Sequence, residues 1–204
     1  MESIHRIEPD HPTSKRIQWK EGIRVLGISE SFQKGEEKSF VAGVVMRGDL
    51  RIDGFGFCSP TVGGMDSTES LLEMYHRLDR QDIKAWMLGG SIISWFNPID
   101  IHVLEDETKL PVVCVSYWPS DGLEKYVREY FPKDWVTRMR RIKSLGNRQK
   151  VDIETGFSIY LMTTGIDIKS ATGLVEHFTH SGRVPEPIRV ARQLAASFRQ
   201  FQSI

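Results

Sequence analysis

The chain of 204 residues lacks an excess of charge of either sign, because lysine plus arginine and aspartate plus glutamate each number 27. A neutral chain has no overall attraction to nucleic acid or to an acidic partner, so any such affinity must be local. No apolar run reaches the roughly 18 residues that a membrane helix needs. The first residues, Met-Glu-Ser-Ile-His-Arg, lack the apolar core of a signal peptide. We therefore expect a cytoplasmic protein that makes no membrane contact.

Cysteine is scarce, and its two copies, Cys58 and Cys114, stand in strand-like apolar runs. Buried free thiols fit this setting better than a redox pair. Neither cysteine has a histidine near it in sequence, and Gly-x-Ser-x-Gly and phosphate-loop patterns are absent, so a covalent nucleophile is not indicated. The hydrophobic share of 40% is enough for one sizeable domain. We expect it at residues 22–204, after an N-terminal arm at residues 1–21.

The run Gly22–Glu30 is apolar and β-branched, which predicts a central strand buried on both faces. Two further runs around Arg47-Gly-Asp predict a hairpin of residues 40–46 and 50–57. Other strands are expected at residues 83–88, 111–117 and 151–163, the last of which can also be a pair. Helices are expected at residues 66–78, from Asn97-Pro98 onward, and at residues 122–131, 134–145, 167–178 and 187–201. This order predicts an α/β fold, a mixed β-sheet flanked by helices with ribonuclease H-like architecture.

Four short blocks occur in one order along the chain: Val25–Ile28, Thr61–Asp66, Leu88–Ser91 with Phe96–Ile101, and Gly182–Ala191. Together they resemble the archaeal endonuclease V-like family, which includes deoxyuridine-specific endonucleases. The resemblance implies a ribonuclease H-like fold and metal-dependent cleavage of DNA or RNA, with deaminated bases as targets. In that fold, carboxylates at strand ends hold one or two Mg²⁺ or Mn²⁺ ions, which activate water and stabilise charge on the leaving oxygen.

Three acidic positions implied by the resemblance are replaced in this chain. The family's central strand ends Gly-Ile-Asp-Asp, whereas this chain reads Gly-Ile-Ser29-Glu30. The family turn Val-Asp-Gly-Met-Asp reads Val-Gly63-Gly-Met-Asp66 here, and Leu-Asp-Gly reads Leu-Gly89-Gly. Loss of three carboxylates is expected to reduce Mg²⁺ affinity severely, since even a residue that only supports a metal ligand is worth about 10–100-fold.

The acidic residues that remain are Glu30, Asp66 and Asp100, and we consider all three as metal ligands, with Glu30 and Asp66 as the catalytic pair. Each has a simpler interpretation. Glu30 also suits a solvated loop. Asp66, with Glu69 three residues later, has the pattern of a capping box, and Asp100 suits the first turn of a helix.

Positive charge gathers between Trp135 and Lys150, a stretch without an acidic residue. Its cations are Arg138, Arg140, Arg141, Lys143, Arg148 and Lys150. In a neutral protein this is the strongest local indication of phosphate contact, with Trp135 as a candidate for stacking on a base. The alternatives are a solvated helix face and a tryptophan packed in the core.

Two further clusters stand near the end of the chain. Arg189 follows a Pro-Glu186-Pro turn, where it can contact phosphate or fix the last helix onto the sheet. His177 and His180 are three residues apart, which suits a transition metal but also the end of a helix.

Three functions follow. The first is a weak or inactive relative of the endonucleases that binds nucleic acid or a partner. The second is an active Mg²⁺-dependent endonuclease that uses Glu30 and Asp66. The third is a structural subunit, for example of a homo-oligomer.

Overall fold

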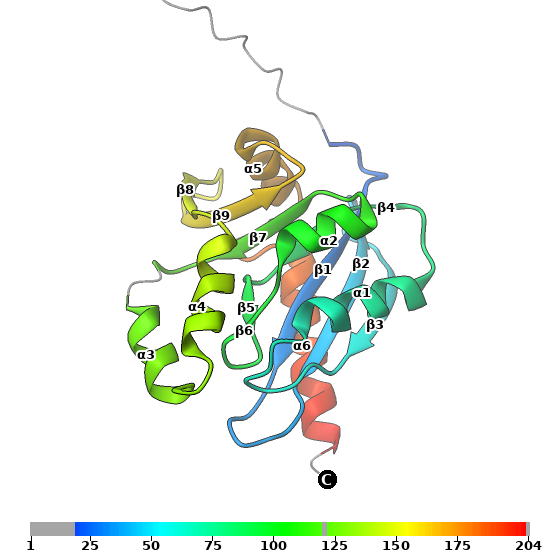
Figure 1. Ribbon diagram of the computed structural model, residues 1–204. Coiled ribbons are helices and arrows are strands. Elements are labelled where there is room, and N and C mark those ends of the chain that lie inside the picture. The colour runs from blue at the N-terminus through cyan, green and yellow to red at the C-terminus, as the bar shows by residue number, and fades with distance from the viewer. Residues whose placement is uncertain (1–18, 120–121, 203–204) are drawn as a thin grey trace, which may run out of the picture.

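The computed structural model describes residues 19–119 and 122–202, so most of the expected N-terminal arm lies outside the described residues (Figure 1). Seven strands form one sheet in the order β3-β2-β1-β4-β7-β9-β8. They are β1 (Arg24–Ser31), β2 (Phe40–Arg47), β3 (Ile52–Cys58), β4 (Ile83–Leu88), β7 (Val112–Ser116), β8 (Gln149–Asp152) and β9 (Ser158–Thr164). A separate two-stranded sheet pairs β5 (Ile92–Ile93) with β6 (Asn97–Pro98).

The helices are α1 (Ser67–Leu78), α2 (Ile101–Thr108), α3 (Leu123–Tyr130), α4 (Trp135–Ser144), α5 (Ile168–His177) and α6 (Glu186–Gln202). Strands β1, β4 and β7 pair in parallel, whereas β2 pairs antiparallel with β1 and β3, and β9 pairs antiparallel with β7 and β8. The predicted mixed α/β sheet is confirmed. Because the three parallel strands end at one edge, the residues that follow them come together there.

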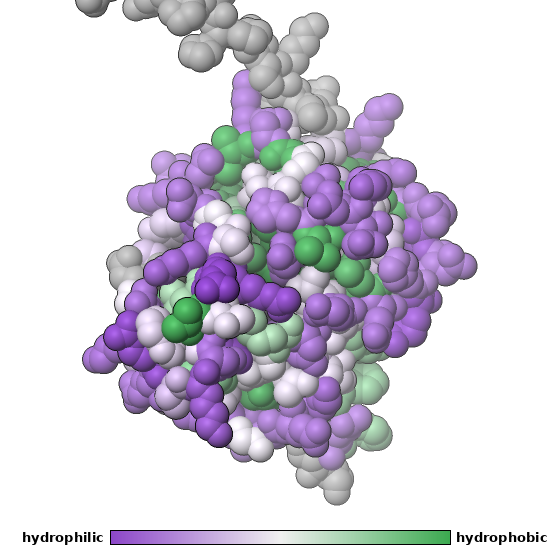
Figure 2. Space-filling view, in the orientation of Figure 1, coloured by the Kyte–Doolittle hydropathy of each residue, from purple (hydrophilic) through white to green (hydrophobic). Residues whose placement is uncertain are grey.

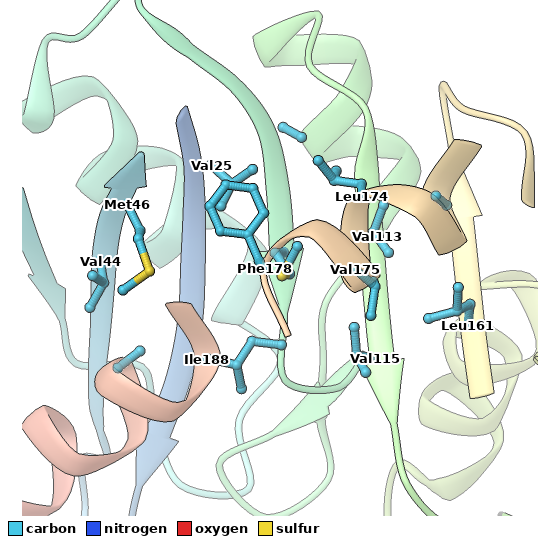
Figure 3. Packing of buried hydrophobic residues seen from close by; sticks show 14 of the residues in the cluster. Val25, Val44, Met46, Val113, Val115, Leu161, Leu174, Val175, Phe178 and Ile188 are labelled. Atoms are coloured by element: carbon cyan, nitrogen blue, oxygen red, sulfur yellow. The ribbon is translucent and has the colours of Figure 1, made fainter. Parts of the chain in front are cut away.

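Both faces of the sheet are covered, because its central strands are apolar on both sides. Val25 and Val113 point from the sheet toward Phe178, at the end of α5, and Ile188 of α6 (Figure 3). On the opposite face, Leu71 is among the α1 and α2 residues that complete a second buried cluster. Figure 1 shows α1 and α2 on the side of the sheet away from α6.

Gly27 in β1 lets α6 begin directly against the central strand. A Cβ atom at this position would lie 2.3 Å from Cβ of Pro187 and 2.6 Å from its carbonyl carbon. No such approach is possible for another residue, so Gly27 and Pro187 fix where the last helix meets the sheet. The expectation that the Pro-Glu-Pro turn opens this helix is confirmed.

Helices α3 and α4 cover neither face. They pack on each other, and α4 also contacts β6, beyond the carboxyl end of β7 (Figure 1). This position places them beside the edge where the parallel strands end.

The prediction that Asn97-Pro98 starts a helix is wrong. These residues form β6, and α2 begins at Ile101 with Asp100 as its N-cap. The cause is the Asn97 side chain, which accepts a hydrogen bond from Ser67 N at 3.1 Å and donates one to Thr61 O at 2.9 Å. These contacts with distant segments hold the backbone extended.

Cys58 and Cys114 are free and buried, as predicted, and burial raises the pKa of each thiol to about 12. They are therefore inert at neutral pH. The face of the molecule seen in Figure 2 is mainly hydrophilic, with hydrophobic residues scattered across it. In the described part of the chain, none of the helices combines the length and the apolar character needed to cross a bilayer.

Candidate functional site

Ser29 and Gly89, two of the three positions where the resemblance implies an acidic residue, lie side by side at the carboxyl ends of β1 and β4. The Gly89 N–H donates to Ile28 O at 2.9 Å, and a Cβ atom at Gly89 would lie 3.6 Å from Ser29 Oγ. That Cβ would also lie 3.0 Å from Ile188 Cγ2 and 3.1 Å from the carbonyl oxygen of Ile28. A side chain at position 89 would therefore be in tight contact with apolar and backbone atoms.

The third substituted position, Gly63, is closed by aromatic rings. Its φ of +70° lies in the left-handed region that favours glycine. A Cβ atom here would lie 3.0 Å from ring atoms of both Trp95 and Phe131. An acidic side chain at position 63 would therefore have to displace two aromatic groups.

Glu30, at the end of β1, is turned inward and holds a loop. Its Oε2 accepts hydrogen bonds from Ser94 N at 2.6 Å and from Ser94 Oγ at 3.1 Å. Burial raises the pKa of the Glu30 carboxyl group, and the two hydrogen bonds from Ser94 only partly oppose this. Glu30 is therefore partly buried, and its Oε2 atom holds the loop at Ser94.

The loop that Glu30 holds is strained. Ser94, Trp95 and Phe96 have φ values of 47°, 56° and 65°, a left-handed conformation that non-glycine residues adopt rarely. Such a conformation persists only where the surroundings enforce it. Here Ser94 O accepts a hydrogen bond from Gly63 N at 2.7 Å, so the loop is tied to the substituted turn as well as to Glu30.

Asp66 stands at the start of α1, but its side chain does not cap that helix, so the predicted capping box is wrong. Its oxygens accept hydrogen bonds from Thr61 Oγ1 and from Asn97 Nδ2, each at 2.7 Å, and from Thr61 N at 3.1 and 3.2 Å. Partial burial raises the pKa of the Asp66 carboxyl group, but these hydrogen bonds outweigh it and leave the pKa below its usual value. Asn97 Oδ1 binds the first N–H of α1 in place of Asp66.

The three acidic candidates serve separate local structures. Glu30 binds Ser94, Asp66 binds Thr61 and Asn97, and Asp100 caps α2 through His102 N and Val103 N. Within residues 19–119 and 122–202, no group of three or more His, Cys, Asp or Glu side chains is placed to hold a metal ion. The expected set of three carboxylate ligands is therefore not assembled, and His177 and His180 form no such group with Glu176.

Arg138 does not lie on an exposed basic face, which corrects the expectation of phosphate contact. Its side chain is buried and donates hydrogen bonds to Gly63 O, Gly64 O and Phe96 O at 2.7–2.9 Å. It also pairs with Asp134 at 2.7 Å. The guanidinium group therefore connects α4 to the turn at Gly63 and Gly64 and to the loop that ends at Phe96.

The other expected nucleic-acid contacts divide into two groups. Arg141 donates to Met65 O at 2.9 Å, and Arg189 donates to the carbonyl oxygens of Ser181 and Val184, so both stabilise turns. Arg140 and Lys143 are exposed on α4. Lys143 makes an ion pair with Glu124 at 3.1 Å. Arg140 and Lys143 keep the predicted capacity to contact phosphate.

Sequence reasoning missed the loop Ser94–Phe96 and the residues that gather on it from α3. Tyr130 contacts Trp95 of this loop and stacks on Tyr126, which is one helical turn away on α3. Lys34, in the loop that follows β1, lies over the rings of Trp95 and Tyr130. The only signal in the sequence was the i, i+4 spacing of the two tyrosines.

A mixed seven-stranded sheet flanked by helices, with three parallel strands at its centre, is the architecture expected of a ribonuclease H-like protein. A family model described as endonuclease dU matches residues 21–199, and the chain belongs to that family. It is 36% identical over 177 residues to a UPF0215 protein of Pyrobaculum aerophilum, which covers 86% of this chain and 94% of the relative. The resemblance noted in the sequence is confirmed.

Solved structures share the fold. A crystal structure of an Archaeoglobus fulgidus protein of unknown function superposes with a TM-score of 0.75 at 30% identity, and covers 86% of this chain and 98% of that one. Endonuclease V of Ciona intestinalis, crystallised with a 24mer DNA that contains an inosine, gives a TM-score of 0.57 at 15% identity over 87% and 86% of the two chains. At that identity the likeness shows the ribonuclease H-like fold alone.

Proposed function

We propose that this protein binds nucleic acid at the carboxyl end of its sheet and hydrolyses it weakly or not at all. The proposal rests on what the structure has at positions 29, 63 and 89, where the resemblance implies carboxylates. Ser29 supplies a hydroxyl group, Gly89 faces Ile188, and Gly63 faces the rings of Trp95 and Phe131. At positions 63 and 89, a side chain would meet atoms of the protein itself already at its Cβ atom.

The donor set left at this edge does not fit Mg²⁺ or Mn²⁺. Both ions require several oxygen ligands at close range, preferably ionised carboxylates. Burial favours the neutral form of Glu30, whose Oε2 already binds Ser94. Both oxygens of Asp66 are bound by Thr61 and Asn97. A cation would have to compete with these hydrogen bonds at Glu30 Oε2 and at both oxygens of Asp66.

Nucleic-acid binding is supported by the fold and by local charge. A protein with this fold was crystallised on inosine-containing DNA. In this chain, Arg140 and Lys143 are exposed on α4, and Lys34 and Lys38 are exposed in the loop that follows β1. Cations of this kind bind phosphate groups without regard to sequence, with an affinity that falls as salt concentration rises.

The test measures binding and cleavage on the same substrates. Purified protein is titrated into labelled single-stranded and duplex DNA and RNA that contain uracil or inosine, at low and moderate salt, followed by fluorescence anisotropy. The same substrates are then incubated with Mg²⁺ or Mn²⁺. We expect salt-sensitive binding without metal-dependent nicking. Nicking that disappears in Asp66→Ala would overturn the proposal in favour of an active nuclease, and absence of binding at low salt would favour an assembly role.

A pair of variants locates the phosphate contacts. Replacement of Arg140 and Lys143 together by glutamine is expected to weaken binding and to lower the salt slope by about 0.7 for each phosphate of a single strand that is no longer neutralised. The matched control replaces Arg51 and Lys84, exposed cations at the opposite end of the sheet, and is expected to leave the slope unchanged. Equal effects of the two double variants would contradict the placement on α4.

A further inference from the structure

Two exposed tyrosines on α3 have nearly parallel rings and lie near the turn that contains Gly63. The ring centroids of Tyr126 and Tyr130 lie 6.5 Å apart, and the ring planes are within 13° of each other. The two residues are 47% and 38% exposed, respectively. Partly exposed amphipathic aromatic groups are suited to binding a flat, partly polar ligand.

Ring-to-ring contacts lead from Tyr130 inward to the turn that contains Gly63. Tyr130 lies 5.5 Å from Trp95, and Trp95 lies 4.9 Å from Phe131, measured between ring centroids. Trp95 and Phe131 are the two residues that close the space at Gly63. The residues Phe131, Trp95, Tyr130 and Tyr126, here called the aromatic row, thus run from the substituted acidic position to the surface.

Cations accompany the aromatic row. Lys34 Nζ lies 4.3 Å from the ring centroid of Tyr130 and 5.0 Å from that of Trp95. On the same helix as the tyrosines, the Arg128 guanidinium group lies 4.1 Å from the ring centroid of Trp135. Glu124, an acidic residue of α3, is bound by Lys143 and Arg128. Rings interleaved with cations are complementary to a ligand that combines flat bases with phosphate groups.

We infer that the aromatic row is a stacking platform for unpaired bases of a single-stranded nucleic acid, whose phosphates lie along Lys34 and Arg128. The inference rests on the proposed nucleic-acid binding and adds the form of the ligand. Bases within a duplex have their faces covered by neighbouring bases, so a platform of exposed rings selects unpaired nucleotides. Stacking tolerates every base, which predicts little sequence preference.

The experiment uses Tyr126→Leu, Tyr130→Leu and the double variant, because leucine keeps an apolar side chain and removes the ring. Binding to a labelled oligothymidylate and to an abasic oligomer of equal length is measured by anisotropy at low salt. Removal of each stacking ring is expected to weaken binding of oligothymidylate about 5- to 150-fold. Binding of the abasic oligomer, which has the same phosphates and no bases, should stay as in the wild type.

Phe55→Leu is the matched control, because Phe55 is 47% exposed but lies on β3, at the edge of the sheet away from β7. It should leave binding of both oligomers unchanged, and circular dichroism checks that each variant is folded. Equal loss on both oligomers would overturn the platform in favour of a structural effect. Unchanged binding of oligothymidylate would also overturn it and assign the exposed rings to another class of partner, such as a protein.

Failure of the two proposals is distinguishable. If wild-type protein binds neither oligomer, nucleic-acid binding itself fails, and the platform fails with it. If wild-type protein binds and the tyrosine variants bind equally well, only the stacking platform is rejected.

Discussion

Gly63 is the residue that most clearly separates this site from a carboxylate-lined one. The rings of Trp95 and Phe131 pack against the side of Gly63 where a side chain would stand. Gly63→Ala combines a backbone cost at φ +70° with the contact between Cβ and the rings of Trp95 and Phe131. The left-handed conformation alone costs a non-glycine residue roughly 1–2 kcal/mol. We expect a larger loss, about 3 kcal/mol, in the free energy of unfolding measured with urea.

Gly182→Ala separates the two contributions. Gly182 has a φ of 67°, and a Cβ atom there would meet nothing within 4 Å. The control variant should therefore lose only the backbone cost, roughly 1–2 kcal/mol. Equal losses in the two variants would show that the rings yield easily, which would remove the main argument that position 63 is closed to an acidic side chain.

Glu30 gives the site a pH dependence whose sign is set by burial. Burial raises the pKa of Glu30 above its ordinary value of 4.5, so the folded protein holds this proton more tightly than the unfolded chain. The stabilising contribution of the group is therefore complete below pH 4.5 and is lost as pH rises through the folded pKa. Glu30→Gln removes the titration and keeps an oxygen that accepts from Ser94 N.

The expected result is a variant whose stability, relative to wild type, increases as pH rises above 4.5, measured by urea unfolding at several pH values. A flat difference for Glu30→Gln would mean that the carboxyl group is not buried in solution.

At the scale of elements, α4 is fixed against the site by the side chain of Arg138. Arg138→Met would leave the carbonyl oxygens of Gly63, Gly64 and Phe96 without their donor in a buried place. Removal of one partner from such a network costs about 3–5 kcal/mol. We expect a loss of this size in urea unfolding, whereas Arg140→Met, exposed on the same helix, should stay within about 0.5 kcal/mol of wild type.

If Arg138→Met instead keeps full stability and loses only nucleic-acid affinity, the sequence-based expectation of a phosphate contact would hold. The hydrogen bonds to three carbonyl oxygens would then not be the main role of this residue.

The elements themselves were largely predictable, because their signals are local. The apolar run at β1, the hairpin β2–β3 and the helical periodicities of α1 and α6 each appear within a short window. The order of these elements was enough to predict the mixed sheet. Apolar runs also predicted that Cys58 and Cys114 are buried.

The details of the site were not predictable, because they depend on contacts between distant segments. Arg138 is 75 residues from the carbonyl group of Gly63 that it binds, and Ser94 is 64 residues from Glu30. Neither partner leaves a periodic pattern in sequence. The left-handed loop Ser94–Phe96 contains no glycine, so the usual sign of such a conformation was missing.

At the scale of the whole molecule, the proposal that no donor set fits Mg²⁺ or Mn²⁺ predicts how stability responds to divalent cations. A ligand that binds only the folded state at 100 times its Kd adds about 2.7 kcal/mol, which raises the Tm of a chain of this size by several degrees. Since Glu30 and Asp66 are already bound within the protein, we expect no Mn²⁺-dependent rise in Tm in thermal unfolding followed by circular dichroism.

Ser29→Asp supplies the contrast, because it places a carboxylate at a largely buried position at the end of β1. An unpaired buried carboxylate is destabilising, and a divalent cation that binds it offsets part of that cost. This variant should have a lower Tm than wild type without metal and should recover part of it with Mn²⁺. A rise in the wild-type Tm as large as that of Ser29→Asp would mean that the native edge of the sheet binds the cation after all, and the argument from its replaced carboxylates would fail.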